Sequence, residues 1–177
     1  ENMTGYQNLI KLVSISNTEG FYFKPRIDRE CLEKYHEGLI CLSACIAGEV
    51  AKAAMISYDR AKEVALWHDK VFGHGNYFLE MQNHEDNSIE QKVTNQTVIR
   101  ISRETGIPLV VTNDCHYTLP EDAASHDVLL CMQENKLVTD EDRIHYTGGQ
   151  YYVKSEEEMR ALFPEFGEAI DNTQKIA

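Results

Sequence analysis

The sequence predicts an α/β fold built on parallel strands. Three apolar runs begin near residues 39, 77 and 109, and each is followed, after a turn, by a helical pattern. A strand that reaches the next strand through a helix runs parallel to it, because the crossover returns the chain to its starting edge. The regular spacing and the absence of a low-complexity linker favour a single unit over residues 1–177.

The chain is expected to begin with two helices. Thr4 is a candidate N-cap for a helix that ends near Gly20. Its apolar side chains follow the i, i+3, i+4, i+7 pattern at Tyr6, Leu9, Ile10 and Val13. A second, short helix is expected from Asp28 to about His36.

The first βα unit covers residues 39–72. Residues 39–42 form a four-residue apolar run that predicts a buried strand. Helices are expected over 48–57 and 59–72, and Gly73 ends the second of them. The second helix has an apolar face that carries one histidine: Ala61, Val64, Ala65, His68 and Phe72.

The second βα unit begins with residues 77–82, which are rich in strand-forming side chains. Residues 83–86 predict a turn. Ser88 and Gln91 stand in capping-box positions for a helix that Gly106 closes.

The third unit has a strand over 109–112 and a loop over 113–117. Thr118 and Glu121 predict a capping box for a helix to about Asn135. The expected apolar face of this helix is Ala124, Val128, Cys131 and Met132.

The C-terminal region has weaker strand signals. Residues 150–153 predict a short strand. Ser155 and Glu158 predict a capping box for a helix that breaks at Pro164.

Composition excludes several classes of function. With 17 Lys and Arg against 29 Asp and Glu, the net charge is −12 on 177 residues, which disfavours nonspecific binding of nucleic acid by this segment. No apolar run approaches the ~20 residues of a membrane-spanning helix. The five cysteines are odd in number and form no Cys-x-x-Cys pair, which favours a reducing cytoplasm over a disulfide framework.

Chemically capable side chains follow the expected strand ends. Cys45 follows the first strand, His84 the second, and Asp114 with His116 the third. In parallel α/β folds this edge of the sheet carries the active site. Asp114 and His116 are two residues apart, so both project to the same side in extended backbone. A thiolate from Cys45 would complete a mixed donor set suited to zinc or a similar divalent ion.

Each of these residues also has a structural interpretation. Asp114 follows an asparagine in a turn, where both residue types are common. Cys45 fits a small core residue, and His84, in a polar turn, fits a solvated histidine. Glu80 lies in a strand and is a candidate supporting carboxylate. His68 fits a hydrogen-bonded boundary residue, and two histidines carry no spacing signal, His126 and His145.

Several motifs resemble one family in the right order. The motifs lie at residues 4–9, 38–49, 112–117 and 126–133. They resemble the PHP (polymerase and histidinol phosphatase) domain of bacterial DNA polymerase III alpha subunits. The resemblance extends through essentially all of residues 1–177, including the segments 78–82 and 152–159.

The resemblance implies a partial PHP-type, distorted (βα)7 TIM-like barrel whose strand ends hold up to three metal ions, with zinc or manganese as the expected cofactors. The family's late Asp-x-His ligand pair corresponds to Asp114 and His116, and the ligand in its Leu-Ser-x-Cys turn corresponds to Cys45. Glu80 and His84 would at most support these ligands. Because all three ligand positions are kept, the resemblance favours a metal-binding parent protein with 3′–5′ exonuclease or phosphoesterase proofreading.

The family's other ligands are absent from this sequence. An early His-x-His motif and the following Asp, His and Glu ligands, with a further His, would precede residue 1, together with the N-terminal strands of the barrel. The polymerase palm and fingers would follow residue 177. We therefore expect an excised, C-terminal portion of a PHP domain that is inactive by itself and binds metal poorly or not at all.

Three functions remain open from the sequence. The first is a phosphoesterase module within a DNA-directed DNA polymerase, a nucleotidyltransferase of chromosome replication. The second is a catalytically idle module that braces the polymerase and docks a proofreading subunit. The third, a free-standing metallophosphatase, is disfavoured by the polymerase-like motifs. The expected partners are the remainder of polymerase III alpha, the sliding clamp and a proofreading subunit, with DNA reached only through the parent protein and no membrane.

Overall fold

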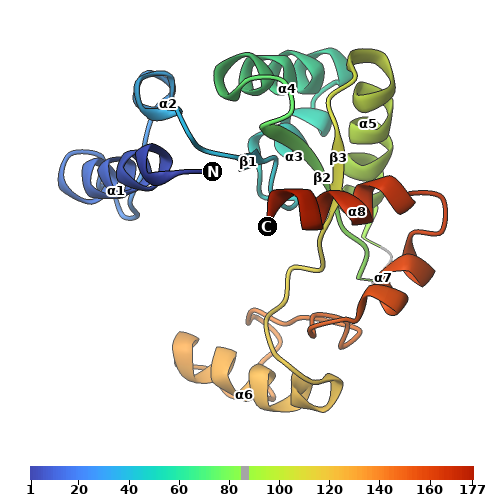
Figure 1. Ribbon diagram of the computed structural model, residues 1–177. Helices are drawn as coiled ribbons and strands as arrows, with labels where there is room; N and C mark the ends of the chain where they lie inside the picture. Colours follow the sequence, from blue (N-terminus) through green and yellow to red (C-terminus); the bar gives the residue numbers. More distant parts are fainter. Residues whose placement is uncertain (85–87) are drawn as a thin grey trace.

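A three-stranded parallel sheet lies at the centre of the fold (Figure 1). The computed structural model describes residues 1–84 and 88–177. The strands are β1 (Cys41–Leu42), β2 (Tyr77–Met81) and β3 (Leu109–Val111), in the order β1-β2-β3. Both neighbouring pairs are parallel. The predicted α/β class and the parallel pairing are therefore confirmed, whereas the predicted turn at 83–86 lies partly outside the described residues.

Three helices follow the first two strands: α3 (Glu49–Ala54), α4 (Tyr58–Phe72) and α5 (Ile89–Thr105). Helices α4 and α5 pack against β2, and α3 packs against α4 and α5. Leu79 on β2 is fully buried in one apolar core with Val64 of α4 and Ile101 of α5. Burial of such side chains is the main favourable contribution to the stability of this layer.

The predicted ends at Ser88, Gly73 and Gly106 are confirmed, and the Ser88 hydroxyl accepts a hydrogen bond from the backbone N–H of Gln91. Ser57, predicted to lie inside a helix over 48–57, instead caps α4 and accepts from the backbone N–H of Arg60. Gly106 closes α5 with a φ of 79°, in the left-handed region that glycine adopts without strain. His68 is hydrogen-bonded through Nδ1 to the carbonyl of Val64 at 2.9 Å, as expected of a boundary residue.

Helices α1 (Met3–Thr18) and α2 (Arg29–Tyr35) lie together at one side of the sheet (Figure 1). The N-cap of α1 is Asn2, whose side chain accepts from the N–H of Gly5, so the prediction of Thr4 as the cap is wrong. The apolar face predicted to be buried is exposed: Tyr6, Leu9, Ile10 and Val13. Gly5, Asn8 and Leu12 are buried instead, because α1 meets backbone at residues 37–38.

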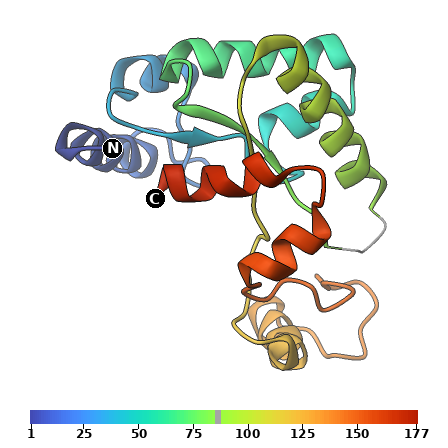
Figure 2. The same cartoon turned by 45° about the vertical axis from the view of Figure 1, so that its right-hand side comes forward.

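Helix α6 (Ala123–Glu134) stands apart from the sheet in both views (Figures 1 and 2). A short 3₁₀ turn, Pro120–Asp122, precedes it, and the Asp122 carboxylate accepts from the N–H of Leu119. The predicted capping by Thr118 is therefore wrong. Of the predicted apolar face only Cys131 is buried, since α6 has no sheet beneath it.

Helices α7 (Glu156–Leu162) and α8 (Gly167–Ile176) complete the chain. The predicted capping box at Ser155 and Glu158 is confirmed. Helix α8 packs along β3, where the Asn172 amide donates to the carbonyl of Leu109 at 2.7 Å. The predicted strand at 150–153 is reduced to a single parallel bridge between Tyr117 and Tyr152.

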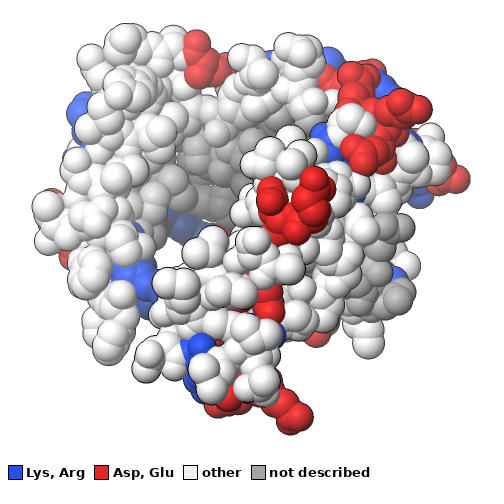
Figure 3. Space-filling model, turned by 90° about the horizontal axis from the view of Figure 1, so that it is seen from below, with Lys and Arg blue, Asp and Glu red and all other residues white. Residues whose placement is uncertain are grey.

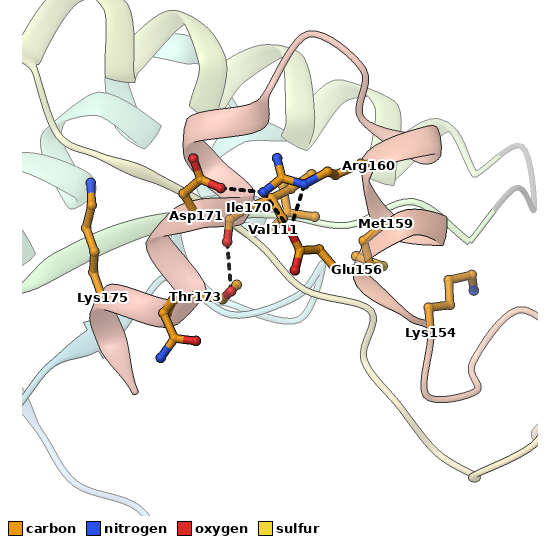
Figure 4. Close-up of a pocket in the computed structure, with 10 residues that line it drawn as sticks. Val111, Lys154, Glu156, Met159, Arg160, Ile170, Asp171, Thr173 and Lys175 are labelled. Atoms are coloured by element: carbon orange, nitrogen blue, oxygen red, sulfur yellow. Dashed lines mark hydrogen bonds and ion pairs between the residues drawn. The ribbon is translucent and has the colours of Figure 1, made fainter.

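A cleft of about 640 Å³ lies between α7 and α8 (Figure 4). The Arg160 guanidinium reaches Asp171 of α8 at 2.5 Å and Glu156 of α7 at 2.8 Å. Both carboxylates pair with this cation, so the charges of these three side chains are matched within the cleft. No helix in the described part of the chain combines the length and the apolar character needed to span a bilayer.

Candidate metal centre

The end of β3 brings the predicted Asp-x-His pair together. Asp114 Oδ1 lies 3.6 Å from His116 Nε2, and the two side chains are 39% and 29% exposed. Asp114 has a φ of 46°, a left-handed conformation that aspartate adopts more readily than most residues. Cys115 between them turns away, with its thiol directed at the carbonyl of Tyr152 at 3.4 Å. The predicted convergence of Asp114 and His116 is therefore present in the structure.

The loop that carries the pair is tied to a later segment of the chain. The buried amide of Asn113 donates to the carbonyls of Gln150 at 2.9 Å and Tyr152 at 2.7 Å. The backbone N–H of His116 donates to the carbonyl of Tyr151 at 2.8 Å. These bonds occupy the backbone groups of both segments, so residues 150–152 fix the loop that begins at β3.

His84 lies in the same region but is buried. Its side chain is covered by Tyr151, with ring centroids 4.1 Å apart and nearly parallel, and the residue is only 5% exposed. Its Nε2 is 3.2 Å from the carbonyl oxygen of Asn113. The interpretation of His84 as a solvated turn histidine is wrong, because a segment more than sixty positions later covers it. His84 packs behind the loop that carries Asp114.

Glu80 is a buried carboxylate that links the strand ends. Its Oε1 accepts hydrogen bonds from Gln82 Nε2 at 3.0 Å and from the Thr112 hydroxyl. Its own backbone N–H donates to the Ser43 hydroxyl at 2.8 Å. Glu80 thus connects β2 to the residues that follow β1 and β3.

Cys45 lies in the turn after β1 and is partly buried. Burial and the proximity of the Asp114 carboxylate and of Cys45 raise the pKa of the Tyr146 phenol. Cys45 and Asp114 therefore lie within electrostatic range of one hydroxyl group. Cys45 and Asp114 do not belong to a common set of three metal-binding side chains, since the described residues hold no group of three His, Cys, Asp or Glu side chains arranged to bind a metal ion.

The donor chemistry fits a divalent ion in part. A carboxylate oxygen and an imidazole nitrogen meet at Asp114 and His116, and both are donors that zinc and manganese accept. Two donors are fewer than the three protein ligands that a catalytic zinc site uses. The described residues thus bring two of the three predicted donors together and form no three-donor group that includes Cys45.

Three aromatic side chains around His116 were not predicted from the sequence. The ring of Tyr146 is 4.5 Å from that of His116, the ring of His126 5.4 Å, and that of Tyr151 5.7 Å. They come from three separate positions along the chain, so no local periodicity indicates their meeting. The only signal in the sequence is the density of Tyr and His between residues 116 and 152.

Comparisons with known proteins complete the description of the site. A profile of the family described as "PHP domain" matches residues 1–84. The whole chain is 44% identical to the DNA polymerase III subunit alpha of Borreliella burgdorferi, 43% to that of Campylobacter jejuni and 42% to that of Thermus aquaticus. Each alignment covers 100% of this chain and 15% of the relative, so the chain spans about one seventh of these proteins.

Proposed function

We infer that this chain belongs to the PHP domain family, as found in bacterial DNA polymerase III alpha subunits, and propose that it serves a replicative DNA-directed DNA polymerase. Its residues would form one unit, the C-terminal portion of a PHP domain with a distorted (βα)7 barrel. The identity along the whole chain supports this assignment. The net charge of −12 indicates that other parts of the polymerase hold the DNA.

Within that protein, the proposed role of this segment is to supply metal ligands for a 3′–5′ exonuclease or phosphoesterase site. The meeting of Asp114 and His116 at 3.6 Å is the observation that carries the proposal. Both would ligate zinc or manganese, with Cys45 as a further ligand. A bound ion would supply Lewis-acid activation of a phosphodiester.

The surrounding residues have defined tasks in this proposal. Asn113 holds the ligand loop against residues 150–152, and Glu80 holds the end of β3 through Thr112. His84 fills the space behind the loop. Ligand-orienting residues of this kind commonly change metal affinity by ~10–100-fold when they are removed.

The test is Asp114→Asn in the full-length alpha subunit. We expect loss of the metal-dependent 3′–5′ exonuclease activity with polymerisation unchanged, because the substitution removes a charged ligand outside the polymerase site. Cys115→Ser is the matched control, since the Cys115 side chain turns away from the pair. Exonuclease activity that survives Asp114→Asn would contradict the proposal.

A second candidate function is a structural one, in which the segment braces the polymerase and docks a proofreading subunit. It is favoured by the exposed apolar side chains of α1. Elemental analysis of the full-length protein separates the two functions. Bound metal that His116→Ala removes supports the metal site, and a metal-free wild-type protein supports the brace.

A further inference from the structure

The loop between α6 and α7 is fixed to α6 at residues 143–145. Arg143 Nη1 and Nη2 lie 2.5 and 2.9 Å from the two carboxylate oxygens of Asp127. His145 Nδ1 lies 2.9 Å from the same carboxylate. We name these three residues, Asp127, Arg143 and His145, the Asp127 clamp. The Arg143 side chain is only 8% exposed, which makes this a partly buried, bidentate ion pair, the strong kind in proteins.

A fourth contact completes the attachment of the loop. The backbone N–H of Ile144 donates to Glu134 Oε2 at 2.7 Å. Side chains from two turns of α6 thus bind consecutive residues of the loop. The direction in which the chain leaves residue 145 is set by α6, and the next residue is Tyr146.

The side chain of Tyr146 packs against His116. Its ring lies 4.5 Å from the His116 ring at an angle of 44°, and 4.7 Å from the Tyr151 ring in an edge-on arrangement. Tyr151 in turn accepts a backbone hydrogen bond from His116. The His116 imidazole is therefore packed by the Tyr146 ring, whose place is set by the clamp, and by the Tyr151 ring. The backbone carbonyl of Tyr151 also binds the backbone N–H of His116.

We propose that Tyr146 is a positioning residue for His116, and that the Asp127 clamp sets the place of Tyr146. A partly exposed imidazole can occupy several rotamers, and only one of them places its nitrogen where it can bind the ion. Ring packing by Tyr146 restricts the imidazole to the rotamer in which Nε2 faces Asp114. The proposal rests on the proposed metal-binding function, because positioning matters only if His116 binds an ion.

The first test measures zinc affinity of the full-length alpha subunit by competition with a chelating indicator. Tyr146→Ala should weaken zinc binding by ~10–100-fold, the range found for residues that orient a ligand. Tyr146→Phe keeps the ring and should bind as wild type does. Wild-type affinity in Tyr146→Ala would overturn the proposal. An equal loss in both variants would also overturn it, because the hydroxyl group would then be responsible.

The second test needs no metal. Diethyl pyrocarbonate modification of His116 in the metal-free protein, followed by mass spectrometry, reports how well the imidazole is covered. The rate of His116 modification should rise severalfold in Tyr146→Ala and stay unchanged in Tyr146→Phe. His74, which is 63% exposed and remote from the site, is the internal control.

The two tests separate the failure of this inference from the failure of the proposed function. A wild-type protein that binds no zinc contradicts the metal-binding function. An unchanged rate of His116 modification in Tyr146→Ala contradicts the positioning role, whatever the metal content. Asp127→Asn provides a second variant, which leaves the rings of Tyr146 and His116 intact. Like Tyr146→Ala, it should raise the rate at which His116 is modified.

Discussion

Asp127 is the residue on which the loop over the candidate site depends. Hydrogen bonds from Arg143, and then from His145, lower the pKa of its carboxyl group from the ordinary 3.8 to about 2. A carboxyl group with a lowered pKa in the folded state stabilises that state once it is ionised. The contribution is fully present above the unfolded-state pKa of 3.8, and it is lost as the pH falls towards about 2.

The expected consequence is an acid-dependent difference between the wild-type chain and Asp127→Asn. At neutral pH the variant should unfold at a lower urea concentration, because Asn keeps the shape but not the charge that Arg143 binds. The difference should shrink as the pH falls from 3.8 to about 2, where the wild-type carboxylate is protonated. Urea midpoints measured across this range check the prediction, and a difference that does not change with pH would refute it.

At the scale of elements, α1 is attached through backbone rather than through its apolar face. A Cβ atom at Gly5 would lie 1.8 Å from the carbonyl oxygen of Gly38, so only glycine permits this approach. The Asn8 amide donates to the carbonyl of Glu37 at 2.9 Å beside it. The contact places α1 against the residues that lead into β1.

Gly5→Ala should therefore destabilise the chain. The added methyl group has to displace backbone, and overpacking of this kind typically costs ~1–3 kcal/mol. Gly167→Ala, also in a helix, is the matched control, because its Cβ would meet nothing closer than 3.6 Å. The control should stay within ~0.5 kcal/mol of wild type, as surface substitutions usually do. Equal free energies of unfolding for the two variants, from denaturant titration, would contradict the close approach.

At the scale of the whole molecule, the surface combines strong negative charge with exposed apolar side chains. Acidic groups gather towards one side of the face seen in Figure 3, and much of the rest carries no charge. On α1 and the segment after it, large apolar side chains are about half exposed or more: Met3, Tyr6, Leu9, Ile10, Val13, Phe21, Tyr22 and Phe23. A concentration of apolar side chains on one element is typical of an interaction surface.

We expect the isolated chain to self-associate through this surface. Multi-angle light scattering should give a mass that rises with concentration above the 20.3 kDa of one chain. Replacing both Ile10 and Val13 by Lys should return the mass towards the monomer. Ile56→Lys, which changes a 79% exposed side chain on another part of the surface, should have no such effect. A chain that stays monomeric at all concentrations would contradict the expectation.

The sequence determined the local structure with considerable success. The serines at residues 88 and 155 cap their helices as predicted, and the strands are parallel as predicted. The nearness of Asp114 and His116 could also be predicted, because they are only two residues apart, although the backbone between them is not extended and Asp114 has a φ of 46°. The helix caps and the Asp-x-His pair rest on contacts between residues close together in the chain, so a few neighbouring residues are enough to predict them.

Only the tertiary structure decided which surfaces are covered. The apolar pattern of α1 predicted a buried face, yet that face has no partner in the described part of the chain. His84 is buried by Tyr151, and His116 is packed by Tyr146, thirty positions away. The burial of a side chain depends on which segment, distant in the sequence, packs over it. The path of the whole chain determines which segment that is. The sequence therefore fixes the donors Asp114 and His116, and the fold fixes the rings that hold them in place.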